Sequence, residues 1–141
     1  MTLKNLINSI SRLAIDEKLI NYAAAGNDIY QLNGLNIDAY PALFACPAGT
    51  HIVRENTTSY SITLFYIDRL LENYSNELDV YSSSIENLKN IILKIKELPG
   101  VLDVEDDYSI TNFQESEKMN DRLGGAYADI NIITSNTYCP E

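Results

Sequence analysis

Four acidic residues that stand close together form the most obvious candidate for metal-binding chemistry in this chain. Asp103, Glu105, Asp106 and Asp107 follow a short apolar run. Hard cations such as Ca²⁺ bind several oxygen ligands that a defined loop supplies. The residue spacing of an EF-hand loop is absent here. The run is therefore interpreted as a solvated acidic turn, and no metal site is predicted.

One histidine and two cysteines are the remaining candidates for a nucleophile or a base. Cys46 lies five residues before His51, across Pro47 and Gly49, and this spacing fits no nucleophile–base pattern. Cys46 and Cys139 lack the spacing of a zinc site and, without a secretory leader, are expected to be free thiols. No phosphate-binding or hydrolase motif is present. We therefore predict no enzyme, no catalytic residue and no cofactor.

Composition restricts the classes of partner. The 141 residues carry a net charge of −10, which argues against a protein that grips nucleic acid through its phosphates. No run of about 18 apolar residues occurs, so no membrane contact is predicted. Ten tyrosines stand against three phenylalanines and no tryptophan. This excess fits either a protein–protein interface or a polar-rimmed core, and composition leaves both open.

The elements that must position these residues are organised around one strand, predicted from Thr58 to Leu71. Its side chains alternate, and one face is apolar throughout: Tyr60, Ile62, Leu64 and Tyr66. The other face becomes apolar at Phe65 and Ile67, which predicts a central strand whose far end is covered. A further strand is expected after Pro41, and a final one from Ala126 to Thr134, after a break at Gly124-Gly125.

Two amphipathic helices are predicted to pack on one face of this sheet. The first runs from Thr2 to about Tyr22, with Gly26 as the left-handed residue that ends it. The second runs from Ser83 to Leu98 and opens with a capping box of Ser83 and Glu86. Its apolar stripe includes three residues expected in the core: Leu88, Ile92 and Ile95.

These elements predict a single α+β domain over residues 1–134, with a mostly antiparallel sheet and a loose tail over residues 135–141. Two segments are the candidate functional surfaces. One is the acidic turn at residues 103–107. The other is an arm between the turn at Pro47–Gly49 and the central strand, which could reach a neighbouring subunit: Gly49, Thr50, His51, Ile52, Val53 and Arg54.

The chain also resembles a known family. Residues 40–98 hold Tyr40-Pro41, the strand Ser-Ile-Thr-Leu-Phe-Tyr-Ile-Asp-Arg-Leu and a serine-rich helix start, and residues 113–134 hold Gly-Gly-Ala-Tyr-Ala-Asp-Ile-Asn-Ile. The pattern is similar to that of neck and tail-completion proteins of tailed bacteriophages, especially crAss-like and other Bacteroidetes-infecting phages. Its layout resembles that of tail terminators, in which a sheet flanked by helices forms a ring subunit.

The resemblance implies a structural virion protein. Six or twelve copies would form a ring that contacts portal, neck and tail proteins and leaves a channel through which DNA passes without specific binding. The acidic turn would then repel phosphate over roughly one Debye length, about 8–10 Å. The acidity could equally serve solubility before assembly. The alternative function is a small cytosolic protein-binding or regulatory module without catalysis.

Overall fold

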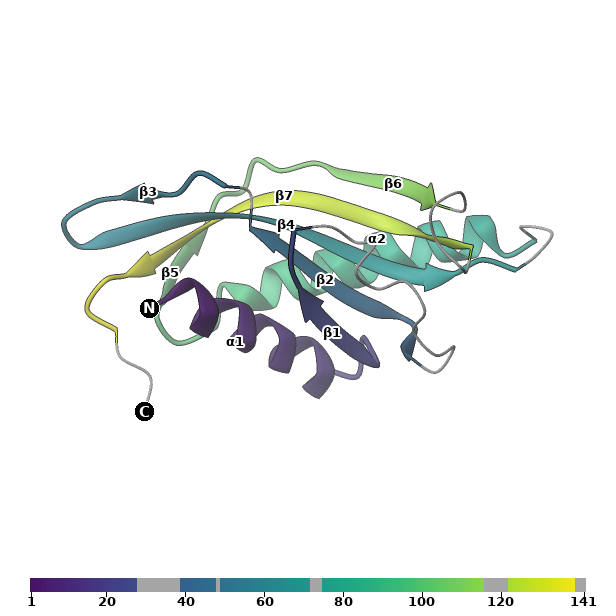
Figure 1. Ribbon diagram of the computed structural model, residues 1–141, viewed down its shortest axis with the longest axis horizontal. Helices are drawn as coiled ribbons and strands as arrows, with labels where there is room; N and C mark the ends of the chain where they lie inside the picture. The colour runs from purple at the N-terminus through teal and green to yellow at the C-terminus, as the bar shows by residue number, and fades with distance from the viewer. Residues whose placement is uncertain (28–38, 48, 72–74, 116–121, 139–141) are drawn as a thin grey trace.

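The computed structural model describes residues 1–27, 39–47, 49–71, 75–115 and 122–138 (Figure 1). The predicted turn at Asn33-Gly34 lies outside these residues. Within them, two helices and seven strands follow one another along the chain: α1 (Leu3–Asp16), β1 (Tyr22–Ala25), β2 (Ala42–Pro47), β3 (Ile52–Val53), β4 (Thr57–Arg69), α2 (Glu77–Ile95), β5 (Val101–Val104), β6 (Ile110–Glu115) and β7 (Leu123–Ser135).

The strands form one mixed sheet in which β4 is central. The order is β1-β2-β4-β7-β5, with β3 pairing β4 beside β2 and β6 pairing β7 beside β5. Only the β1–β2 pair is parallel, and the other pairs are antiparallel. Along its whole length β4 pairs with β7, from Thr57 opposite Ser135 to Arg69 opposite Leu123. The prediction of a central strand here is confirmed.

Both helices join one core with the apolar side of β4. Leu6 and Ile10 of α1 and Leu88 of α2 are fully buried in a cluster that contains Ile62 and Leu64. The Tyr66 hydroxyl, on the same side of β4, donates to the Leu19 carbonyl oxygen after α1 at 2.7 Å and accepts from Asn87 Nδ2 of α2 at 2.9 Å. The α+β prediction is confirmed: two helices pack against a mostly antiparallel sheet.

The opposite side of the sheet holds a second, smaller cluster. Its buried members come from β2, β4 and β7 and the approach to β2: Tyr40, Ala42, Phe44, Ile67 and Leu123. Three half-buried rings lie beside it, with Phe65 5.6 Å from Phe113 and 5.4 Å from Tyr127 between ring centroids. The prediction that β4 becomes apolar on both faces toward its end is therefore confirmed.

The first helix is shorter than predicted. α1 begins after Thr2, whose hydroxyl accepts from the Asn5 amide at 3.1 Å, as expected for an N-cap. It ends at Asp16, because Lys18 adopts a left-handed conformation with φ 60°. The amide of Asn21 then donates to the Pro41 carbonyl oxygen at 2.8 Å, and Tyr22–Ala25 become strand β1. Pairing with β2 outweighs the high helix propensity of these alanines.

The second helix is longer than predicted at its start. α2 begins at Glu77, with Asn76 as N-cap, so the predicted capping box of Ser83 and Glu86 is wrong. Ser83 lies inside the helix, where its hydroxyl donates back to the Val80 carbonyl oxygen at 3.3 Å. Acidic side chains in the first turn, at Glu77 and Asp79, favour the earlier start. The buried stripe of the helix is as predicted.

Gly124 and Gly125 lie inside β7 and do not precede it, so the predicted break is wrong. A Cβ on Gly125 would point straight at the carbonyl oxygen of Tyr66 in the neighbouring strand and would lie 2.9 Å from its carbonyl carbon. Glycine is therefore required for the close approach of the β4 and β7 backbones, not for a turn.

Candidate functional site

The predicted arm is one strand of a hairpin that projects from the sheet. β3 pairs antiparallel with the start of β4, Ile52 opposite Ser59 and Val53 opposite Thr58. The Arg54 amide donates to the Thr57 carbonyl oxygen at 2.8 Å and closes the turn. This hairpin, residues 49–59, extends to one end of the molecule (Figure 1). At its tip, Ile52 is 53% and Val53 75% exposed, so two large apolar side chains face solvent on an edge strand.

The tip of the hairpin is fixed by Asn136, which follows β7. Its side-chain amide donates to the carbonyl oxygens of Arg54 at 2.8 Å and of Glu55 at 3.3 Å, and its backbone amide donates to the Asn56 carbonyl oxygen at 2.9 Å. The Thr58 hydroxyl donates to Asn136 Oδ1 at 2.5 Å. Each end of the turn is thereby held to the end of β7. The sequence does not predict these contacts of Asn136, because a short polar tail gives no periodic signal.

His51 stands at the base of the arm. Its Nδ1 accepts from the Ser61 amide at 3.2 Å, and its ring meets the ring of Tyr60 edge-on at 5.3 Å. The Tyr60 hydroxyl in turn donates to the Met1 carbonyl oxygen at 3.0 Å. Cys46 lies on β2, opposite Thr63 of β4, and Cys139 lies outside the described residues. These contacts give His51 a role in orienting the arm.

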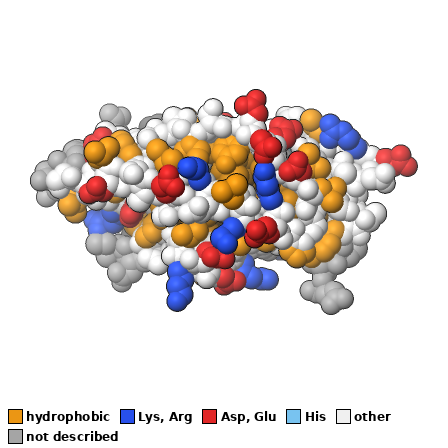
Figure 2. All heavy atoms as spheres, turned by 180° about the vertical axis from the view of Figure 1, so that it is seen from behind, with side chains coloured by type: hydrophobic (Ala, Val, Ile, Leu, Met, Phe, Trp, Pro, Cys, Tyr) orange, Lys and Arg blue, Asp and Glu red, His pale blue; other side chains and the backbone are white. Residues whose placement is uncertain are grey.

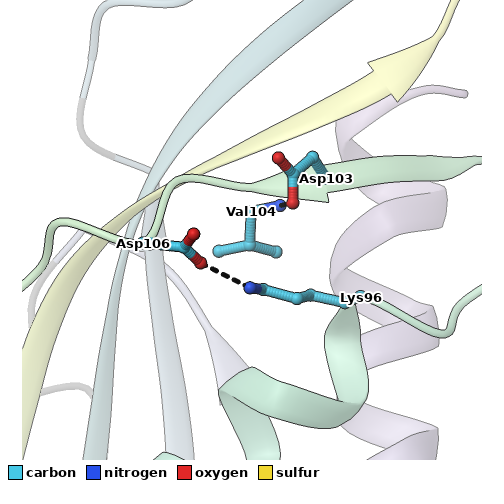
Figure 3. Close-up of polar contacts among 4 residues, drawn as sticks. All are labelled: Lys96, Asp103, Val104 and Asp106. Carbon is cyan, nitrogen blue, oxygen red and sulfur yellow. Dashed lines mark hydrogen bonds and ion pairs between the residues drawn. The ribbon is translucent and has the colours of Figure 1, made fainter.

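The acidic turn follows β5 and reaches α2 (Figure 3). Asp106 Oδ1 accepts a hydrogen bond from Nζ of Lys96, which lies just past the end of α2, at 2.5 Å. This hydrogen bond and the negative charge of Asp106 raise the pKa of Lys96. Asp103 Oδ1 accepts from the amide of Val104 at 2.9 Å. Glu105 Oε2 accepts from Asn131 Nδ2 of β7 at 3.0 Å. These three carboxylates have local partners, although all remain exposed.

Strand register brings the arm and the acidic turn to the same end of the sheet. Ile52 lies opposite Ser59, Ser59 opposite Ile133, and Ile133 opposite Asp103. One row thus crosses β3, β4, β7 and β5. With about 4.8 Å between neighbouring strands, Ile52 and Asp103 lie about 14 Å apart along it. The two segments are separated by about 50 residues in sequence, so sequence alone could not place them side by side.

The other groups that could do chemistry are dispersed. Among the described residues, no three His, Cys, Asp or Glu side chains are grouped to hold a metal ion. A shallow hollow of about 360 Å³ lies between α1 and the turn before β5, and its polar lining includes Ser9, Arg12 and Asp16. This lining offers one cation and one carboxylate to a small polar molecule, and it contains no histidine or cysteine.

Charge on the face shown in Figure 2 is mixed in sign. Acidic and basic side chains interleave there among hydrophobic ones, and the negative charge is not gathered into one patch. An exposed concentration of carboxylates is found at the acidic turn, residues 103–107. This turn is therefore the best-defined acidic surface near the hairpin.

A second apolar surface, which sequence reasoning missed, lies at the opposite end of β4. Leu71, two residues after β4, is 55% exposed, and Leu78, in the first turn of α2, is 80% exposed. Asn76, the N-cap of α2, ties the end of β4 to the start of the helix: its Oδ1 accepts from the Leu71 amide at 2.8 Å, and its Nδ2 donates to the Arg69 carbonyl oxygen at 3.2 Å. Leu78 stands among polar residues in the sequence, so no periodic pattern marks it as part of a surface.

Comparison with protein-family models and with curated proteins gives no match to this chain. In the part of the chain that the structure describes, neither helix has the length and apolar character needed to cross a membrane.

Proposed function

We propose that this chain is the subunit of a homo-oligomeric ring in the neck or tail of a tailed phage, with a tail-terminator-like fold. Such a ring joins the portal and head to the tail and leaves a channel for DNA. The observation that carries the proposal is the hairpin with a fixed conformation, whose apolar tip faces solvent at the end of the sheet where the acidic turn begins. The resemblance of the sequence to neck and tail-completion proteins points in the same direction.

The hairpin suits contact between subunits. Ile52 and Val53 stand on an edge strand, where unpaired backbone groups invite a partner. Burying apolar surface stabilises a complex by about 25 cal/mol for each Å² removed from water. Because Asn136 already fixes the tip, little conformational entropy is lost when it docks. A monomer with two exposed apolar residues on a fixed arm favours assembly over isolation.

The acidic turn suits a DNA channel. All four of its carboxylates are exposed: Asp103, Glu105, Asp106 and Asp107. Carboxylates on a channel wall repel phosphate within about 8 Å at physiological salt and keep the duplex from adhering. A ring of six or twelve copies repeats this turn around its axis, so the repulsion is distributed over the whole circumference.

Native mass spectrometry and negative-stain electron microscopy of the purified protein test the ring. We expect closed rings of six or twelve copies. A stable monomer that binds one soluble cytosolic partner would favour a regulatory binding module and contradict the proposal. Mass spectrometry gives the number of copies, and electron microscopy shows whether those copies form a closed ring or an open filament.

Duplex binding by the rings tests the channel. Glu105→Lys with Asp107→Lys reverses the two charges whose loss disturbs neither the Lys96 ion pair nor the Val104 amide. We expect parent rings to leave duplex DNA unbound and variant rings to retain it, with binding that falls as salt rises. Glu86→Lys with Glu97→Lys, on exposed positions of α2 and just after it, makes the same change in net charge elsewhere. If both variants bind duplex DNA equally well, the acidic turn does not line the channel.

A further inference from the structure

Among the described residues, four of the eight large exposed apolar side chains lie in two pairs, one at each end of β4. The hairpin end presents Ile52 and Val53, and the opposite end presents Leu71 and Leu78. The other large exposed apolar residues are spread over α1, β1, α2 and β5: Ile15, Tyr22, Leu93 and Leu102. The 13 residues of β4 separate the two pairs by about 40 Å, and Figure 1 shows the β3–β4 hairpin and the start of α2 at opposite ends of the molecule.

Arg54 at the hairpin end and Asp79 at the start of α2 carry opposite charges, and the exposed Glu55 comes directly after Arg54 in the turn. Arg54 follows Val53 directly, is exposed, and makes no ion pair with a residue that the structure describes. Asp79 follows Leu78 directly and is exposed as well, and Glu77 precedes it. An apolar pair followed by a cation can therefore meet an apolar pair flanked by carboxylates. In the reverse arrangement, hairpin against hairpin, Arg54 would face its own copy and Leu78 would stay in water.

We propose that the hairpin of one copy docks at Leu71 and Leu78 of the next copy. This inference rests on the proposed ring and names its subunit contact. Because the two surfaces lie at opposite ends, the contact is heterologous and joins copies head to tail. Such a contact repeats until the rotation between copies closes the ring. Asn76 and Asn136 fix the two surfaces in advance, so docking needs no rearrangement of either.

The central experiment uses two variants, each of which removes one half of the contact. Val53→Asp disables the hairpin and Leu78→Asp disables the surface that receives it, and both positions are exposed, so the monomer fold is expected to persist. We expect each variant alone to be monomeric by light scattering, with self-association at least about tenfold weaker than in the parent. Mixed in equal amounts, the two variants retain one working contact and should form a dimer that cannot grow. Leu93→Asp, at an exposed position on α2, is the control that should assemble like the parent.

A charge reversal checks the orientation of the contact. Arg54→Glu should weaken assembly, and Asp79→Arg in the same chain should restore it, because each copy then meets the reversed charge of its neighbour. Circular dichroism melts confirm that every variant is folded. If Asp79→Arg fails to restore assembly, Arg54 does not face Asp79 of the neighbouring copy, and the proposed orientation is wrong.

The outcomes separate this contact from the ring itself. If parent rings form and both aspartate variants form them equally well, the ring stands and the contact is overturned. A mixture of the variants that stays monomeric also overturns the contact, as does a result in which Val53→Asp loses assembly while Leu78→Asp assembles like the parent. A parent protein that remains monomeric up to about 1 mM, where even a Kd of that size would be visible, overturns both the contact and the ring.

Discussion

Gly125→Ala is expected to weaken the sheet at its centre. Gly125 of β7 lies opposite Ile67 of β4. An added Cβ would meet the Tyr66 carbonyl group, with its carbon at 2.9 Å and its oxygen closer, and the Ile67 Cα at 3.3 Å. These atoms belong to the backbone of a central strand and cannot rotate away. The methyl group can therefore be accommodated only if β4 and β7 move apart.

The cost follows from two effects. Overpacking in a well-packed interior costs about 1–3 kcal/mol. A ladder hydrogen bond weakened by the separation costs about 0.5–1.5 kcal/mol. The loss of glycine's freedom in the unfolded chain offsets this by about 0.4–1 kcal/mol. We expect the free energy of unfolding to fall by about 1–4 kcal/mol.

Gly124→Ala is the matched control, one residue away in the same strand. The three atoms nearest to its Cβ all belong to the Leu70 side chain, at 3.1–3.2 Å, and a side chain can shift where a strand backbone cannot. Its effect should remain within about 1 kcal/mol of zero. Urea unfolding monitored by circular dichroism measures both variants. If Gly125→Ala and Gly124→Ala differ by less than about 0.5 kcal/mol, the reasoning from close backbone approach is refuted.

Two further predictions concern α2 and the end of β4. Leu88→Ala removes a fully buried side chain and should lower the free energy of unfolding by about 2–5 kcal/mol. Leu93, on the same helix, is 55% exposed, so Leu93→Ala should change the melting temperature little. Equal melting temperatures of the two variants would place Leu88 outside the core. Burial raises the pKa of Asp68 in the folded protein. The contribution of this residue to the free energy of unfolding is therefore complete below its ordinary pKa of 3.8 and is lost as the pH rises through the higher pKa of the folded state. Asp68→Asn can still accept from the Arg69 amide and should therefore stabilise the protein at about pH 7 but not at about pH 3, and a gain independent of pH would contradict this assignment.

The tyrosine excess was left open by composition, and the structure places individual members. Tyr40 and Tyr66 are buried, and the hydroxyls of Tyr60 and Tyr66 donate to backbone carbonyl oxygens. These residues act as core side chains with a polar end that needs a partner. Tyr22 is an exposed exception, at the edge strand β1.

The sequence by itself determined the elements whose patterns are periodic and long. Alternation over Thr58–Leu71 identified the central strand, and the stripe of Leu88, Ile92 and Ile95 identified the buried side of α2. Pro41 marked the start of β2, since proline cannot donate to a ladder. Both periodicities follow from covalent geometry, so they can be read without knowing any partner.

Only the tertiary structure decided features that depend on a partner distant in sequence. Tyr22–Ala25 became a strand because β2 offered an edge, against local propensity. Gly125 is needed because the β4 backbone passes close to it. The arm and the start of the acidic turn lie in one row across four strands because of the strand register, and Asn76 ties the end of β4 to the start of α2. A local pattern states which side of an element is buried, whereas the choice of neighbour depends on the competition among all the pairings that the chain can form.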